Sequence, residues 1–400
     1  MRTLIFPLIA RTAALIALIT VCGCAPHSTP PNTAAAKGRA PADAWAYSQT
    51  ITIDTTPTGA NVLEDVTQYP LAVLLDKSCF DFNQARPDGA DIRFFDPQGK
   101  ALPHAIELWD KASGSAAVWV LLDLVKGNSK DQSIVMKWGH SSAPNISDSK
   151  AVFKRQNGFV GAWHLDEDGN TVADGFKDSS DHEAHGTGVG MIPGSRVDAR
   201  IGKGVHLDNP KGQETARWIR VAGEKAVQFN PGPPITFSIW ALGYSYPIRS
   251  YETMIAKGDT SWTLQRVQYN PGGGAQKIGG QGYQTCVRTP KYHLCTYNFA
   301  GQELVTKQWL HFMVVLEEPS MKLYINGTFN ASESAGPWEK GAHDLGIGNQ
   351  TQHLGGRRQW DGILDEARVM HGVRSVSWAK LDYESQRESP TLLQFGEIQK

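Results

Sequence analysis

The strongest constraint on the fold is a pair of apolar runs near the C-terminus that end in an Asn-Gly turn. Residues 309–315 (WLHFMVV) and 323–328 (LYINGT) have the composition of two strands joined by a short polar connection. Asn326-Gly327 is a strong hairpin signal, because both residues tolerate positive φ. The pattern predicts antiparallel β-structure with tight turns.

Residues 360–369 (WDGILDEARV) predict a third strand in the same region. The side chains alternate along it, with Ile363, Asp365, Ala367 and Val369 on one face and Leu364, Glu366 and Arg368 on the other. A helix would scatter this pattern. The adjacent acids Asp365 and Glu366 are therefore expected on opposite faces of a sheet.

The composition agrees with an all-β fold in more than one domain. The chain has 400 residues with Gly 40, Pro 22, Trp 12 and 20% charged residues, which is typical of a turn-rich, aromatic β protein of about two domains. The formal net charge is −1 and the pI about 6.9, so a nucleic-acid partner or an electrostatic membrane surface is not predicted.

Residues 1–23 are predicted to be a signal peptide, with Arg2 and Arg11 in its basic part and an apolar run (12–21) too short to span a bilayer. The sequence at 21–24 (VCGC) resembles a bacterial lipobox, which implies lipidation of Cys24; the alternative is an ordinary signal peptide cleaved near Gly23 or Ala25. Residues 24–44 are Pro- and Ala-rich and predict a flexible linker. No aspartate follows Cys24, so an outer-membrane anchor in the cell envelope is favoured over an inner-membrane one.

Residues 45–153 predict a first β-sandwich. Strand-like runs occur at 49–53, 69–75, 91–95, 104–109, 117–125 and 133–138, separated by turn residues such as Pro87-Asp88-Gly89. Tyr69-Pro70-Leu71, 88–94 (DGADIRF), Val118-Trp119-Val120 and 137–140 (KWGH) resemble a bacterial family catalogued as domain of unknown function 2341. That resemblance implies architecture and little chemistry.

Residues 154–400 predict a second β-sandwich. The segments 157–166 (NGFVGAWHLD), 177–186 (KDSSDHEAHG), 202–207 (GKGVHL) and 235–240 (ITFSIW), with the C-terminal strands above, resemble a laminin-G-like, concanavalin A-like jelly roll. Near the end, Ser375 is expected to cap one short helical turn.

The remaining cysteines suggest one disulfide. Cys286 and Cys295 flank a turn-like segment, and an exported compartment permits oxidation, so a bridge between them is predicted. Cys79 lies in an apolar run without a catalytic histidine pattern and is expected to be an inert thiol.

The acidic residues raise two possibilities, a metal site and a catalytic site. Relatives of the resembled fold often hold a structural Ca²⁺, which implies ligands at Asp178 and Asp365; the alternative is that Asp178 caps an Asx turn and Asp365 accepts other hydrogen bonds. Histidines such as His164 lack zinc spacing. No paired-carboxylate motif of glycoside hydrolases occurs, so no enzyme is predicted.

Exposed aromatic rings are the residue type that stacks on sugars. They cluster in the middle of the second domain, and the predicted ligand-binding set is Tyr244, Tyr246, Tyr251, Trp262, Tyr283 and Tyr292. Trp163, Trp240 and Trp309 are expected in the core. The sequence thus predicts an envelope-anchored protein that binds a glycan or another cell-surface polymer. A structural or adhesive protein-binding role and a polysaccharide-cleaving enzyme with an unrecognised site stay open as alternatives.

Overall fold

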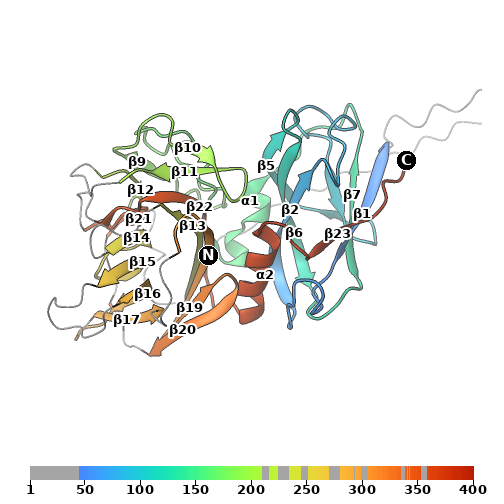
Figure 1. The fold of residues 1–400 in the computed structure, drawn as a ribbon. Helices are drawn as coiled ribbons and strands as arrows, with labels where there is room; N and C mark the ends of the chain where they lie inside the picture. Colours follow the sequence, from blue (N-terminus) through green and yellow to red (C-terminus); the bar gives the residue numbers. More distant parts are fainter. Residues whose placement is uncertain are drawn as a thin grey trace, which may run out of the picture. The chain divides into compact units, whose positions relative to one another are not determined.

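The computed structural model describes residues 45–209, 216–223, 234–244, 251–269, 280–291, 293–298, 305–334, 338–339, 341, 343–352 and 358–400 (Figure 1). The predicted signal peptide, the lipidation site Cys24 and the linker to residue 44 lie outside these ranges. Neither described α-helix has the length and apolar character needed to cross a bilayer.

The first sandwich consists of two antiparallel sheets. Their strands are β1 (Tyr47–Ile53), β2 (Val66–Asp76), β3 (Arg93–Phe95), β4 (Ala101–Leu102), β5 (His104–Asp110), β6 (Ser115–Val125), β7 (Gln132–Trp138) and β23 (Leu393–Phe395). One sheet has the order β23-β1-β7-β3-β4 and the other the order β2-β6-β5. Every strand-like run predicted between residues 49 and 138 overlaps one of these strands.

The second sandwich is a jelly roll built from larger sheets. Its strands are β8 (Phe159–Trp163), β9 (Thr187–Val189), β10 (Arg196–Asp198), β11 (Lys203–Leu207), β12 (Trp218–Val221), β13 (Ile235–Gly243), β14 (Tyr251–Ala256), β15 (Trp262–Tyr269), β16 (Gly280–Arg288), β17 (His293–Asn298), β18 (Trp309–Glu317), β19 (Ser320–Ile325), β20 (Thr328–Ser334), β21 (Leu345–Ile347) and β22 (Gly362–His371). An eight-stranded sheet has the order β10-β11-β22-β13-β18-β19-β20, with β8 on β22, and a seven-stranded sheet has the order β17-β16-β15-β14-β21-β12-β9.

The predicted local features of this jelly roll are present. Asn326 and Gly327 have φ values of 50° and 70° in the turn between β19 and β20. Cys286 and Cys295 lie directly opposite each other on β16 and β17 and form the predicted disulfide. Strand β22 also forms where it was predicted, but with a different distribution of side chains.

A β-bulge in β22 overturns the expected alternation. Ser238 pairs with Arg368 and Trp240 pairs with Asp365, so two residues of β22 face one residue of β13, and Glu366 has a φ of 51°. Leu364, Ala367 and Val369 pack in the core between the two large sheets. The expectation that Asp365 and Glu366 point to opposite faces is wrong, because the extra residue shifts the alternation by one and turns both acids, with Arg368, away from that core.

Helix α2 (Val376–Gln386) lies against this outer face of the eight-stranded sheet (Figure 1). Ser375 Oγ accepts a hydrogen bond from the Trp378 N–H at 3.1 Å, so the predicted N-cap is confirmed. The helix has 11 residues instead of the single turn expected. Its buried positions include polar residues such as Asp382 and Gln386. The helix therefore lacks the apolar stripe from which a helix is usually predicted in a sequence.

The β2-β6-β5 sheet packs on the other side of α2. Tyr69 of β2 makes a 2.7 Å hydrogen bond to Ser385 and an edge-on ring contact with Trp378. Met313 and Met370 from the jelly roll belong to the same apolar cluster as the core of the first sandwich. Residues 43–400 consequently form one unit in which the two sandwiches share a core.

The end of the chain returns to the first sandwich. Strand β23 pairs with β1 through Ile51 and Phe395, and Leu392 is fully buried in the shared core. Residues 392–399, which were predicted to belong to the jelly roll, therefore complete the first sandwich.

The short β23 segment is predicted to contribute strongly to stability. Leu392→Ala should lower the free energy of unfolding by about 2–5 kcal/mol, because it leaves a cavity in the shared core. The matched control Leu63→Ala removes a side chain that is 68% exposed and should change stability by less than about 0.5 kcal/mol. Urea unfolding of both variants measures the difference; equal losses would contradict the role assigned to this segment.

Candidate functional site

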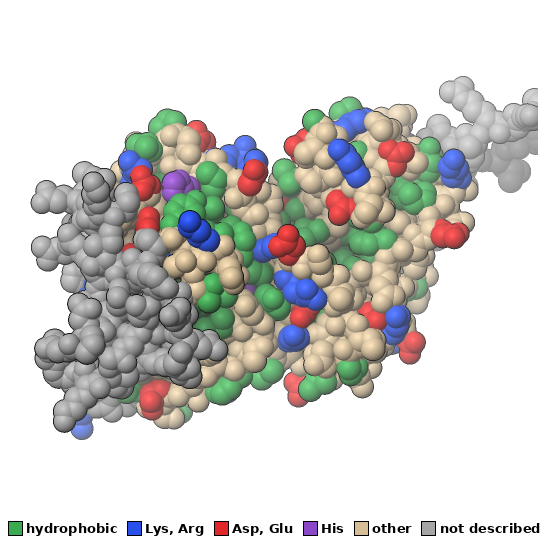
Figure 2. All heavy atoms as spheres, viewed as in Figure 1, with side chains coloured by type: hydrophobic (Ala, Val, Ile, Leu, Met, Phe, Trp, Pro, Cys, Tyr) green, Lys and Arg blue, Asp and Glu red, His purple; other side chains and the backbone are tan. Residues whose placement is uncertain are grey.

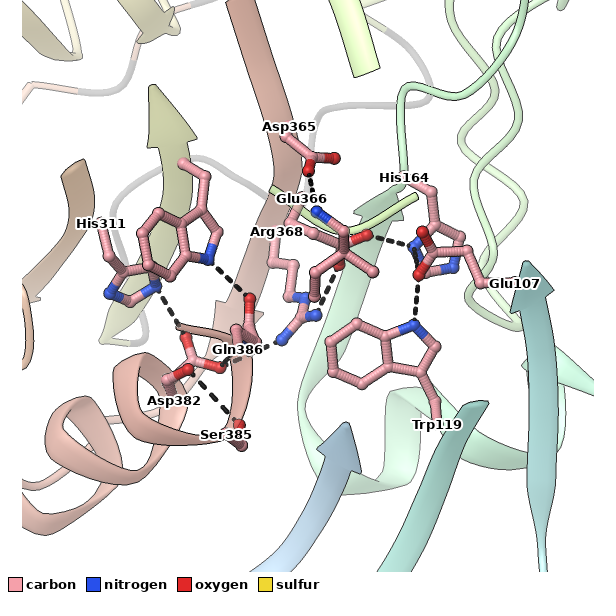
Figure 3. A network of polar contacts seen from close by, with 12 residues as sticks. Glu107, Trp119, His164, His311, Asp365, Glu366, Arg368, Asp382, Ser385 and Gln386 are labelled. Atoms are coloured by element: carbon pink, nitrogen blue, oxygen red, sulfur yellow. Dashed lines mark hydrogen bonds and ion pairs between the residues drawn. The ribbon is translucent and has the colours of Figure 1, made fainter. Parts of the chain in front are cut away.

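A buried cluster of ionisable side chains joins the first sandwich to the jelly roll (Figure 3). Glu107 of β5 accepts a 2.6 Å hydrogen bond from the indole N–H of Trp119 through Oε2. The same oxygen lies 3.3 Å from Nδ1 of His164, and this nitrogen lies 2.6 Å from Oε1 of Glu366. Glu107 sits at a register shift in β5, as Glu366 does in β22, so bulges aim both carboxylates at His164.

The cluster continues through Arg368 towards α2. The guanidinium of Arg368 pairs with Glu366 at 2.5 Å and with Asp382 at 3.1 Å. It also lies 4.3 Å from the ring centroid of Trp119. One arginine thus joins the β22 bulge to helix α2 and stacks on the first sandwich.

Further hydrogen bonds extend the cluster to the outer surface of the jelly roll. Asp382 accepts a hydrogen bond from Gln386 Nε2 at 2.6 Å and lies 3.1 Å from His311 Nε2. Trp240 donates its indole N–H to Gln386 at 2.8 Å. We call the set Glu107, His164, Glu366, Arg368, Asp382 and Gln386 the ionic network.

Protonation keeps this network close to electrically neutral. Burial opposes charge on His164, but Glu366 and Glu107 raise its pKa to about 10. Burial and the charge of Glu366 raise the pKa of Glu107 to about 8, and the same two causes raise that of Asp365 well above its usual range. Burial also opposes charge on Glu366, but His164 and Arg368 lower its pKa. The pKa of Asp382 is also lowered, although its burial opposes this. The two cations His164 and Arg368 therefore face the two carboxylates of Glu366 and Asp382.

The network does not fit a metal centre. Within the described ranges, ligand atoms of Glu107, His164 and Glu366 lie within 4.8 Å of one another. Arg368 already neutralises Glu366, and a divalent cation there would meet this fixed positive charge. The other such group contains Cys286 and Cys295, whose sulfurs form the disulfide.

The two predicted calcium ligands are engaged separately. The carboxylate of Asp178 accepts hydrogen bonds from the backbone of Ala162, Ser180 and Ala184 and from the Ser180 hydroxyl. Asp365 Oδ2 accepts from the Ile201 N–H at 2.8 Å. Asp178 therefore stabilises a turn with both oxygens, as the alternative interpretation of the sequence expects, and a Ca²⁺ shared with Asp365 stays a prediction.

A pocket of about 360 Å³ lies beside α2, next to the end of the ionic network. We call it the candidate pocket. Its lining consists of Arg200, Trp240, Lys307, Gln308, Trp309, Tyr383, Arg387 and Glu388. The Trp240 and Tyr383 rings stack with centroids 5.7 Å apart. The Gln386 hydrogen bond to Trp240 couples this aromatic wall to the network beneath it.

The aromatic residues predicted to bind ligand have different positions. Trp262 is fully buried and stacks on Phe237 at 4.3 Å, and Tyr283 is 7% exposed against Phe312. Both were wrongly assigned to a ligand surface: they occupy inward positions of β15 and β16. Burial accordingly raises the pKa of Tyr283 to about 12.

Tyr244 and Tyr251, two more of the predicted ligand residues, do not line the candidate pocket. Tyr244 contacts the ring of His206, and Tyr251 lies under the guanidinium of Arg358 at 4.9 Å. Both are partly exposed. Tyr246 and Tyr292 lie outside the described residues.

Sequence reasoning missed Trp309 and His164. Trp309 was expected in the core, but it is the first residue of β18, on the outer face, and partly exposed. His164 follows β8 directly and has no partner nearby in sequence; Glu366 is 202 residues away. The position of Trp309 at a strand end is the one signal that could have indicated the pocket.

A larger pocket of about 500 Å³ lies in the first sandwich. Its rings come from phenylalanines, of which Phe80 and Phe82 are almost fully buried against Trp109. Cys79 also lines it, and burial raises the pKa of this thiol, which agrees with an unreactive cysteine. The candidate pocket is the better site because it presents Trp and Tyr rings beside hydrogen-bonding groups.

Fold and site together define an all-β protein in which a lectin-like jelly roll is joined to a second sandwich. Residues 88–184 match the family described as domain of unknown function DUF2341, and residues 217–379 match the concanavalin A-like lectin/glucanases superfamily. The chain thus contains both families in the order expected from the sequence. No curated protein is significantly similar in sequence to this chain.

Several solved structures show a loose likeness. One is domain 4 of AbnA, a GH43 extracellular arabinanase from Geobacillus stearothermophilus, in complex with arabinotriose (16% identity, 57% of this chain and 98% of that one, TM-score 0.39). Others are the binding domain of Paraclostridial Mosquitocidal Protein 1 (14%, 57% and 52%, TM-score 0.40) and the SAP-like pentraxin of Limulus polyphemus (13%, 37% and 70%, TM-score 0.28). Similarities of this size say nothing about what this chain binds.

The network predicts a defined pH dependence of stability. In the folded state Glu107 keeps its proton up to about pH 8, compared with an ordinary pKa of 4.5. His164 keeps its proton up to about pH 10, compared with an ordinary pKa of 6.5. The unfolded chain releases both protons earlier, so stability falls as pH rises through these intervals. Glu107→Gln mimics the protonated carboxyl at every pH and should make the fall between about pH 5 and about pH 8 shallower.

Urea unfolding across this pH range measures the effect. Glu64→Gln changes an exposed carboxyl of the same sandwich and should leave the pH profile unchanged. An unaltered slope in Glu107→Gln would contradict the protonated state assigned to Glu107.

Proposed function

We propose that this protein binds carbohydrate through the candidate pocket and does not cleave it. The observation that carries the proposal is the combination of Trp309 and Tyr383 rings with cationic and amide side chains in one pocket. Aromatic faces stack on the apolar faces of pyranose rings, while polar groups contact the hydroxyls. The match of residues 217–379 to the concanavalin A-like lectin/glucanases superfamily supports a lectin-like role.

Binding is favoured over hydrolysis by the charges in the pocket. Glycoside hydrolysis usually needs two carboxyl groups placed about 5–9 Å apart across the scissile bond. Among the described lining residues Glu388 is the single acid, and its side chain is 87% exposed. The buried acids of the ionic network are protonated or paired with cations, which suits support of the pocket wall.

Trp309→Ala tests the proposal. Loss of the stacking surface should weaken glycan binding about tenfold or more, measured by titration calorimetry with glycans selected on an array. Trp45→Ala removes a partly exposed tryptophan of the first sandwich and serves as the matched control. Failure to bind any glycan, or equal binding by both variants, would refute the proposal.

We also propose that the protein is held at the cell envelope, in the outer membrane, through a lipid on Cys24. The lipobox-like sequence at 21–24 supports this anchor. Two or more acyl chains hold a protein firmly, at roughly 0.8 kcal/mol per buried CH₂. Cys24→Ser should abolish incorporation of radiolabelled palmitate and release the protein from the membrane fraction, whereas Cys22→Ser should leave both unchanged if the protein is processed at Cys24.

A further inference from the structure

The candidate pocket is more basic than the rest of the protein. Its lining includes Arg200, Lys307 and Arg387 but one acid, Glu388, whereas the chain as a whole has a formal net charge of −1. Figure 2 shows acidic and basic side chains interspersed over the described face, so the pocket is a local departure from a mixed surface.

Arg387 forms part of the pocket wall. Its guanidinium donates to the Glu384 carboxylate, to the carbonyls of Glu388 and Ser389, and to the Thr391 hydroxyl. All of its nitrogens are engaged in holding the chain after α2. Four of its five N–H donors are used in this way, which leaves one Nη2 hydrogen.

Arg200 retains donors for a ligand. Its guanidinium lies 5.7 Å from the ring centroid of Trp240. The Nε is buried without a hydrogen-bond partner, so the terminal nitrogens are the donors that a ligand can reach. The nearest carboxylate oxygen of Glu388 is 3.7 Å away, beyond a normal hydrogen bond. Because Glu388 is 87% exposed, this ion pair is weak and easily exchanged.

The other acid near Arg200 forms no ion pair with it. Burial and the charge of Glu366 raise the pKa of Asp365 well above its ordinary value, which opposes a negative charge on its carboxyl. Asp365 contributes to the charge environment of Arg200 from the side of the ionic network. The positive charge of Arg200 is consequently left to the pocket.

Lys307 is the second available cation. Its backbone N–H donates to the Gly243 carbonyl at 2.7 Å, which fixes the residue beside Trp309 at the start of β18. The side chain is exposed, and no acid in the described part of the chain forms an ion pair with it. Both cations therefore line the pocket, Arg200 with only the weak Glu388 ion pair and Lys307 with no ion pair to a described acid.

We propose that the candidate pocket selects acidic sugars, in which a uronic-acid carboxylate binds Arg200 and Lys307 while the sugar ring packs on Trp309 or Tyr383. The carboxylate of Glu388 occupies the place of the ligand carboxylate until the sugar binds. A planar guanidinium and a carboxylate form short, charge-assisted hydrogen bonds, which gives the pocket its preference. This inference rests on the proposed carbohydrate binding and names its ligand class.

The test compares acidic oligosaccharides with their neutral counterparts. The probes are oligosaccharides of homogalacturonan, alginate and hyaluronan, each also in carboxyl-reduced form. At least one acidic probe should bind about tenfold or more tighter than its reduced form at low salt, and the difference should shrink as salt is added.

Variants assign the effect to the pocket. Lys307→Gln should weaken acidic probes about tenfold and leave the reduced forms unchanged, whereas Glu388→Gln should tighten acidic probes because it removes the competing carboxylate. Lys111→Gln, an equivalent change in the pocket of the first sandwich, should alter neither. Circular dichroism confirms that each variant is folded.

Two results separate this inference from the proposed function. If glycans bind and Trp309→Ala weakens them, but acidic probes do not exceed their reduced forms or Lys307→Gln behaves as Lys111→Gln does, the acidic preference is refuted and carbohydrate binding stands. If no glycan binds at all, both fall.

Discussion

The Glu366–Arg368 ion pair at the β22 bulge is the interaction on which the arrangement of the two sandwiches depends. An extra residue in the strand turns Glu366 to the outer face, where it meets His164 and Arg368. A buried charge without partners would be costly, so each carboxylate that stays charged requires the cation beside it. The bulge therefore fixes a set of mutually dependent partners drawn from β5, β8, β22 and α2.

This network also explains why α2 is polar yet buried. Asp382 and Gln386 face Arg368 and Trp240, while Trp378 and Leu381 face the shared apolar core. The helix connects the aromatic wall of the candidate pocket to the first sandwich. Support of this kind holds pocket side chains in one orientation, which reduces the entropy lost when a ligand binds.

Much of the fold was predictable from local patterns. The Asn326-Gly327 turn, the strands of the first sandwich, the Ser375 cap and the Cys286–Cys295 disulfide each depend on neighbouring residues or on directly paired strands. The position of Glu366 was not predictable, because a bulge is a property of the paired strands and leaves the sequence of β22 looking like a regular alternation. Trp262 and Trp309 illustrate the same limit: whether a ring faces the core or the surface depends on what packs above the strand.

The pairing of β23 with β1 has a consequence for how the protein matures. In the described part of the chain, strand β1 has β7 on one side, and residues 392–399 cover its other side. During synthesis, this edge stays unpaired while more than two hundred residues of jelly roll emerge, and an open edge is a template for aggregation. The amino-terminal sandwich is thus the first part to be made and the last to be closed.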